Sequence, residues 1–127
     1  MGNLTLYLQK AFRENCPPGW ECFSEKTLLD GYEKAILGYS PRADVLFVKR
    51  DGSMRMWIEF EVSRADPVAN HAKFATTHIF FPWLETDVFL SMVSSHVARG
   101  RSNLAANTIW LMRRIGLQAY QTSLYLM

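Results

Sequence analysis

Three carboxylates occupy positions that would bring them together on two neighbouring strands. Asp44 opens one apolar run, and Glu59 and Glu61 lie two residues apart in the next. Because residues i and i+2 of a strand point to the same face, Glu59 and Glu61 project together. If the two runs pair about the turn residues Asp51 and Gly52, Asp44 lies across from them. Converging carboxylates repel one another unless a cation neutralises them, and Mg²⁺, for which Mn²⁺ can substitute, prefers oxygen ligands. The spacing therefore predicts a divalent-metal site.

This arrangement resembles the active-site hairpin of the PD-(D/E)xK nuclease superfamily, which has the restriction-endonuclease-like fold. In that family an Asp begins one strand, and an acidic residue, any residue and usually a Lys follow on the next. Asp44 matches the Asp, and Glu59 and Glu61 match the two outer positions of the second element. Glu61 replaces the usual Lys, as in some restriction enzymes of the superfamily. The resemblance implies a metal-dependent endonuclease that hydrolyses DNA phosphodiester bonds, with all three acids as catalytic metal ligands.

The helix expected after Glu61 supplies candidates for the missing lysine. Asn70, Lys73 and Thr77 share one face because they are spaced i, i+3 and i+7. Lys73 is the best catalytic substitute, since its ammonium could reach the metal-bound water or the scissile phosphate. The resemblance implies that Asn70 contacts substrate. The alternative is that both are ordinary solvated helix residues.

Further charged residues are weaker candidates. The resemblance implies a fourth acidic metal ligand near the first helix, for which Glu14 is the first choice and Glu21 and Glu25 compete; each could equally be a surface acid. Arg64 and Arg101 are candidate contacts to DNA phosphates. Arginines at such positions could instead pair with the acids or complement helix ends.

Length and composition indicate a single globular domain over residues 1–127. Hydrophobic residues make up 49% and charged residues 20%, and the net charge of +2 does not by itself identify a nucleic-acid binder. No apolar run is long enough for a membrane helix, and the N-terminus lacks the pattern of a secretory signal. Cys16 and Cys22 are too few for a disulfide framework, so free thiols in a cytoplasmic protein are expected.

Periodicity and turn residues predict an α/β fold in the order αβββαβαβ, with helices flanking a central mixed sheet. We expect helices over residues 3–15, 66–79 and 102–115, and strands over 20–24, 43–49, 54–64, 87–94 and 117–126. Residues 26–39 are ambiguous. In the last helix the expected buried stripe comprises Leu104, Thr108, Leu111, Met112 and Ile115. This order is also that of the restriction-endonuclease-like core.

Two alternatives stay open at this stage. Glu61 in place of the strand Lys is compatible with a catalytically inactive nuclease-like domain that acts as a nucleic-acid- or protein-binding subunit. The acids could also form surface ion pairs in an unrelated α/β domain. A chain of this size leaves little room for a sequence-reading domain, so we expect a homodimer or a subunit of a larger assembly on DNA.

Overall fold

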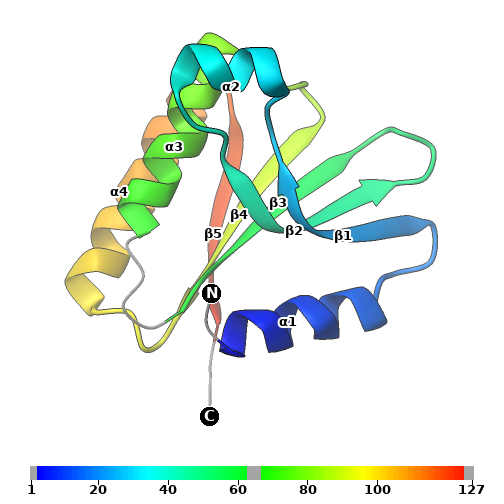
Figure 1. Cartoon of the computed structure of the whole chain (residues 1–127). Coiled ribbons are helices and arrows are strands. Elements are labelled where there is room, and N and C mark those ends of the chain that lie inside the picture. The colour runs from blue at the N-terminus through cyan, green and yellow to red at the C-terminus, as the bar shows by residue number, and fades with distance from the viewer. Residues whose placement is uncertain (1–2, 63–66, 125–127) are drawn as a thin grey trace.

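The computed structural model describes residues 3–62 and 67–124. Within these ranges the chain forms one five-stranded sheet in the order β1-β2-β3-β4-β5, together with four helices (Figure 1). The elements are α1 (Asn3–Glu14), β1 (Trp20–Thr27), α2 (Gly31–Leu37), β2 (Arg42–Lys49), β3 (Arg55–Glu61), α3 (Pro67–Phe80), β4 (Asp87–Ser94), α4 (Arg99–Arg114) and β5 (Gln118–Leu124). The predicted α/β class is confirmed.

The sheet is mixed because its two halves are connected differently. β1, β2 and β3 pair antiparallel, whereas β3, β4 and β5 pair parallel through the crossover helices α3 and α4. The predicted turn between β2 and β3 is confirmed: Gly52 has a left-handed φ of 77°, and its N–H donates to the Lys49 carbonyl at 2.8 Å. This hairpin fixes the register that carries the acidic residues.

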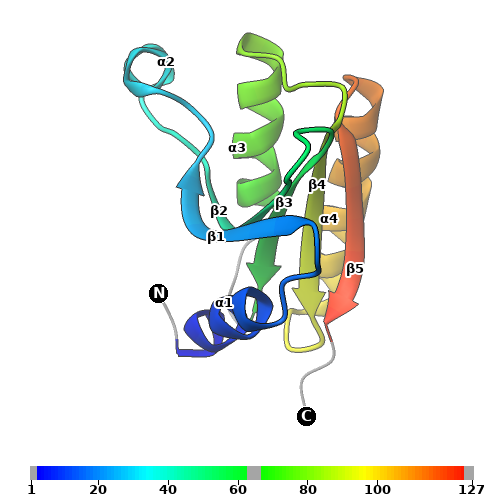
Figure 2. The ribbon, with the colours of Figure 1, turned by 90° about the vertical axis from the view of Figure 1, so that its right-hand side faces the viewer.

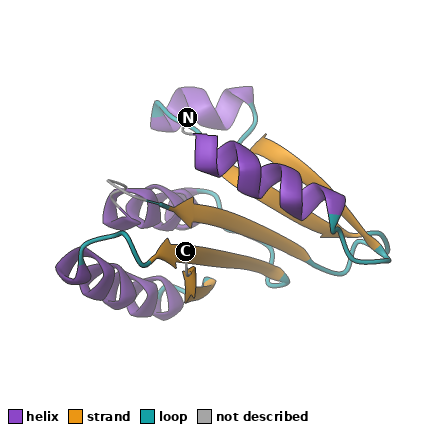
Figure 3. Cartoon of the chain, turned by 90° about the horizontal axis from the view of Figure 1, so that it is seen from below, coloured by secondary structure: helices purple, strands orange, loops and turns teal. Residues whose placement is uncertain are grey.

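Helices cover both faces of the sheet (Figure 3). On one face, Trp57 of β3 packs in the main core with residues of α3 and α4. On the other face, Ile58 and Phe60 pack with Leu8 of α1. The main core comprises Ala43, Leu46, Trp57, Phe74, Trp83, Phe89, Ile109, Met112, Leu117 and Ala119. The alternation along β3 places Glu59 and Glu61 on the α3 face, as predicted.

A short helix, α2, corrects the predicted element order to αβαββαβαβ. The Asp30 side chain accepts from the Glu33 N–H at 2.8 Å, and the Asp30 N–H donates to the Glu33 side chain at 3.2 Å, which makes a capping box. Gly38 ends the helix with a φ of 81°. Figure 2 shows α2 standing away from the sheet, and none of its residues is buried. Capping, rather than burial, therefore defines this helix.

The start and the buried face of α4 differ from the prediction. The helix begins at Arg99, after Ala98, because the Ser102 N–H already donates to the Ala98 carbonyl at 3.0 Å. Leu104 and Leu111, which were expected inside, are 54% and 60% exposed. The buried residues are Ala105, Ile109 and Met112. Both stripes have helical spacing, so periodicity alone could not choose between them.

The prediction of free thiols is wrong, because Cys16 and Cys22 form a disulfide. The turn at residues 17–19 folds the chain back, with the Trp20 N–H donating to the Pro17 carbonyl at 3.2 Å, so the end of α1 meets the start of β1. Free thiols were a reason to expect a cytoplasmic location, and that reason falls away.

The remaining differences from the predicted elements lie at their ends. β3 ends at Glu61, whereas the expected strand ran to residue 64. Residue 66, the expected start of the second predicted helix, and the last two residues of the predicted final strand, 125–126, lie outside the described ranges. No helix in the described ranges has the length and apolar character needed to cross a membrane.

Candidate functional site

The acids predicted from the sequence line one cleft of about 570 Å³. Its walls are the start of β2, the end of β3, the first half of α3 and the segment that leads from α2 into β2. The lining residues include Asp44, Glu59, Glu61, Asn70, Lys73, Glu25, Arg42 and Tyr39. The structure thus brings together five of the eight predicted site residues.

Asp44 and Glu59 form the centre of the cleft. The Asp44 Oδ2 accepts a hydrogen bond from the Phe60 N–H at 2.7 Å, so the carboxylate is anchored across the hairpin to β3. The neighbouring pairing of Val45 with Ile58 sets this register, and it places the Asp44 side chain beside that of Glu59. The two carboxyl groups are hydrogen-bonded to each other.

Glu59 is a buried acid among other acids, since only 7% of it is exposed. Burial raises its pKa well above the ordinary value, and the charges of Asp44 and Glu61 raise it further. Burial also raises the pKa of Asp44, although the Phe60 N–H and the bond from Glu59 oppose the rise. Neither Asp44 nor Glu59 has a basic partner within the described part of the chain. The cleft therefore disfavours the charged form of both acids, and a bound cation would offset that effect.

Glu61 is fully buried and is held from the neighbouring helix. The Asn70 Nδ2 lies 2.9 Å and 3.1 Å from the two carboxylate oxygens of Glu61. Lys73, one turn further along α3, is exposed and lines the same cleft. The face of α3 that was predicted to approach the acids does so, with Asn70 as the contact to Glu61.

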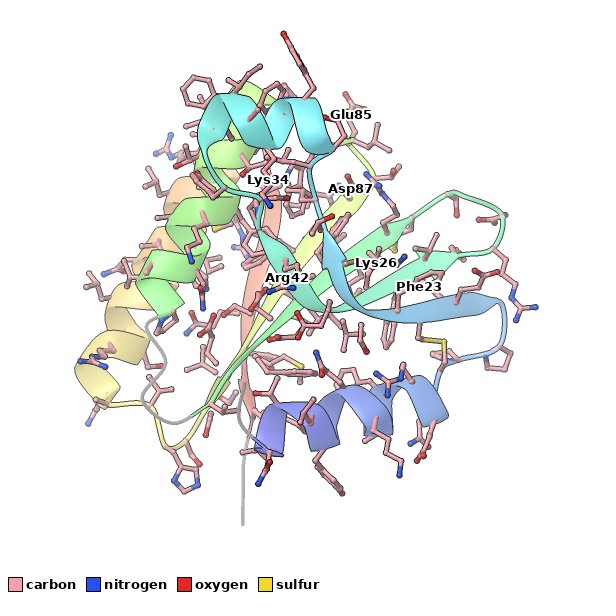
Figure 4. All side chains as sticks on the ribbon, in the orientation of Figure 1. Phe23, Lys26, Lys34, Arg42, Glu85 and Asp87 are labelled. Carbon is pink, nitrogen blue, oxygen red and sulfur yellow. A yellow bond between two sulfur atoms is a disulfide. The ribbon has the colours of Figure 1, made fainter. Side chains whose placement is uncertain are left out.

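Glu25 takes the place in the cleft that was expected for Glu14. Its carboxylate accepts from the Gln9 Nε2 at 3.0 Å, and its second oxygen lies 3.5 Å from the Arg42 Nε. Figure 4 shows Arg42 near the end of β1, where Lys26 follows Glu25. Glu25 has a φ of 56°, the one left-handed non-glycine φ in the described ranges. Its charge contributes to the raised pKa values of Asp44 and Glu59.

The sequence offered a weak signal for Glu25 and a misleading one for Glu14. Glu14 lies at the end of α1, is 63% exposed and pairs with Lys10 at 3.8 Å, away from the cleft. The structure therefore does not bring Glu14 to the acids of the cleft, and its role as a metal ligand stays an untested prediction. Arg101 lies on α4 and does not line the cleft either, so its predicted contact to substrate stays untested as well. Arg64, the third predicted substrate contact, lies outside the described residues.

His71 is a core residue although it adjoins Asn70. It is fully buried on α3, and its Nδ1 lies 2.6 Å from the Thr108 Oγ1 of α4. Burial lowers the pKa of its imidazole to about 4, against a smaller opposing effect of the Ala105 backbone. The ring is therefore neutral at pH 7 and ties α3 to α4, which steadies the helix that carries Asn70 and Lys73.

The donor set of the cleft fits a hard divalent cation in type, but the acids do not surround an ion as they stand. Over residues 3–62 and 67–124, no group of three His, Cys, Asp or Glu side chains is placed to hold a metal ion. Asp44 and Glu59 adjoin each other, whereas Glu61 is turned toward Asn70. A divalent ion would be held by carboxylate oxygens of Asp44 and Glu59.

The fold and the cleft define the chain as an α/β domain with a mixed five-stranded sheet and a buried acidic site. No protein-family model, curated protein or solved structure matches it.

Proposed function

We propose that this protein is a Mg²⁺-dependent nuclease that hydrolyses phosphodiester bonds in DNA, and that its domain is restriction-endonuclease-like. The observation that carries the proposal is the buried Glu59 beside the half-buried Asp44. Neither acid has a basic partner in the described ranges, and both lie in a cleft large enough for a phosphodiester. Placing an unpaired acid in a buried position is costly unless a ligand uses it. A divalent cation with a bound phosphate is the ligand that this chemistry favours.

The residues of the cleft take distinct roles in this proposal. Asp44 and Glu59 would hold the cation. A bound cation would lower the pKa of the attacking water and neutralise charge on the phosphate. Glu61, fixed by Asn70, keeps the end of β3 and the start of α3 together. Lys73 is the one basic residue of α3 that lines the cleft, and it orients the water or the scissile phosphate. Arg42 flanks the opposite wall.

The test is cleavage of linear and supercoiled DNA with Mg²⁺ or Mn²⁺. Wild-type protein should nick or cut DNA, and EDTA should abolish the reaction. Glu59→Gln and Asp44→Asn should each lower the rate by about 100-fold or more, the size of effect expected when a group that stabilises developing charge is removed. Glu14→Gln is the matched control, because it neutralises an acid that lies outside the cleft. Cleavage that survives Glu59→Gln would contradict the proposal.

One observation favours the second candidate, an inactive nuclease-like binding subunit. Glu61 occupies the position where the superfamily usually has Lys, and the Asn70 amide donates to both of its carboxylate oxygens. Binding of DNA by wild type and by Glu59→Gln with equal affinity, and no cleavage with either metal, would select this candidate.

A further inference from the structure

A basic surface without acids lies on α4, away from the cleft. The helix carries four arginines and no Asp or Glu over its 16 residues, so its formal charge of +4 exceeds the +2 of the whole chain. Arg99, Asn103, Asn107, Trp110 and Arg114 are all exposed and follow one another at spacings of three or four residues. They form a single stripe, which we call the α4 stripe.

The first turn of α4 departs from the usual rules for helix stability. It contains Arg99 and Arg101 but no acidic residue, and Ala98 provides no side-chain cap. Positive charges at a helix N-terminus oppose the helix dipole. No described acid forms an ion pair with either arginine. The two charges are therefore not offset by an ion pair within the described residues.

At the other end of α4, a fixed arginine lies between two exposed rings. The Arg113 guanidinium carbon is 4.9 Å from the centroid of Trp110 and 4.7 Å from that of Tyr120 on β5. The Arg113 Nε donates to the Ala119 carbonyl at 2.6 Å, which holds the group in place. Trp110 remains 64% exposed and Tyr120 46% exposed. Flat rings beside fixed positive charge favour stacking of unpaired bases.

We propose that the α4 stripe, with the aromatic group around Arg113, binds a single strand of nucleic acid through its phosphates and one stacked base. Charge complementarity identifies the occupant: Arg99 and Arg114 of the stripe, with Arg113 beside them and no carboxylate on the helix, suit a polyanion. Arg99 and Arg114 are about 22 Å apart along the helix, about the length of six stacked nucleotides. This inference rests on the proposed function for its nucleic-acid substrate, and it adds a second contact surface for that substrate.

The experiment measures binding of short fluorescent oligo(dT) and oligo(U) by anisotropy in EDTA, over a range of KCl concentrations. The double variant Arg99→Gln, Arg114→Gln should reduce the slope of log K against log[KCl] by about 1.4, since each phosphate contact on a single strand contributes about 0.7. Trp110→Leu should weaken binding by about fivefold or more, and Trp110→Phe should retain most of the affinity. The matched control is Lys10→Gln, Arg50→Gln, which removes two exposed charges outside α4.

Each outcome decides the matter. Loss of slope in the α4 double variant but not in the control supports the inference. Unchanged binding in the α4 variants overturns it. Failure of the wild type to bind either oligonucleotide also overturns it. In that case, binding to anionic phosphatidylserine vesicles would identify a membrane surface as the occupant, and a dimer that is lost in Trp110→Leu would identify a second copy of the chain. Binding is measured in EDTA, which suppresses cleavage, so the binding assay and the cleavage assay test the two proposals separately. If the protein binds through α4 but does not cleave DNA with Mg²⁺ or Mn²⁺, only the proposed function is overturned.

Discussion

Replacing Asn70 by Ala should destabilise the protein because the mutation removes two hydrogen bonds from a buried carboxylate. Glu61 is fully buried, and the Asn70 amide nitrogen lies 2.9 Å and 3.1 Å from its two oxygens. A hydrogen bond to a charged group contributes about 1.5–3 kcal/mol. The free energy of unfolding should therefore fall by about 2–3 kcal/mol. For 127 residues, that corresponds to a drop in Tm of about 8–11 °C.

The assay is urea unfolding at pH 7, followed by circular dichroism, within a double-mutant cycle. The single variants Asn70→Ala and Glu61→Gln and the double variant should give a coupling free energy of about 1.5 kcal/mol or more. Asn107→Ala is the matched control, since it removes an exposed helical Asn and should change stability by less than about 0.5 kcal/mol. Coupling below about 0.5 kcal/mol would refute the claim that Asn70 holds Glu61.

Three further predictions test the acidic site, the disulfide-closed turn and the ion pair between β3 and β4. Burial and neighbouring acids raise the pKa of Glu59, so above pH 4.5, its ordinary pKa, the folded protein binds more protons than the unfolded chain. The free energy of unfolding without metal should therefore fall as the pH rises above 4.5 toward the raised pKa. Urea titrations at several pH values should show this fall in wild type but not in Glu59→Gln. An equal pH dependence in the variant would count against that assignment. The Cys16→Ser, Cys22→Ser variant should lose about 2 kcal/mol, and an unchanged urea midpoint would show that the disulfide contributes nothing. The Arg55 guanidinium donates two hydrogen bonds of 2.7 Å to the buried Asp87 carboxylate. Asp87→Ala should lower the free energy of unfolding by about 3 kcal/mol, the lower end of the range for a broken buried ion pair, because Arg55 is partly exposed. A decrease below about 1 kcal/mol in the same assay would show that solvent screens the pair.

The hairpin could be predicted because its information is local. Asp51 and Gly52 specify the turn, and strict alternation around Glu59 specifies which residues face the acids. The same alternation placed Glu59 and Glu61 correctly on the side that α3 covers. Local signals also existed for α2, since Asp30 and Glu33 have the spacing of a capping box.

Other features depend on tertiary placement, which spacing does not encode. Glu25 lines the cleft and has a left-handed backbone conformation, which the alternation of a regular strand does not predict. Two stripes of α4 share one period, and only contact with the sheet shows that Ile109 is inside and Leu111 outside. Pairing of Cys16 with Cys22 depends on the turn that brings the end of α1 to β1.

The most direct test of the central claim is calorimetric titration of Mn²⁺ into wild-type protein and into the Asp44→Asn, Glu59→Gln variant. The account predicts that wild type binds about one ion per chain, because carboxylate oxygens of Asp44 and Glu59 would hold it. Binding should be lost in the variant and kept in Glu14→Gln. Equal Mn²⁺ binding by wild type and the double variant, or no binding by wild type, would contradict a metal site at Asp44 and Glu59.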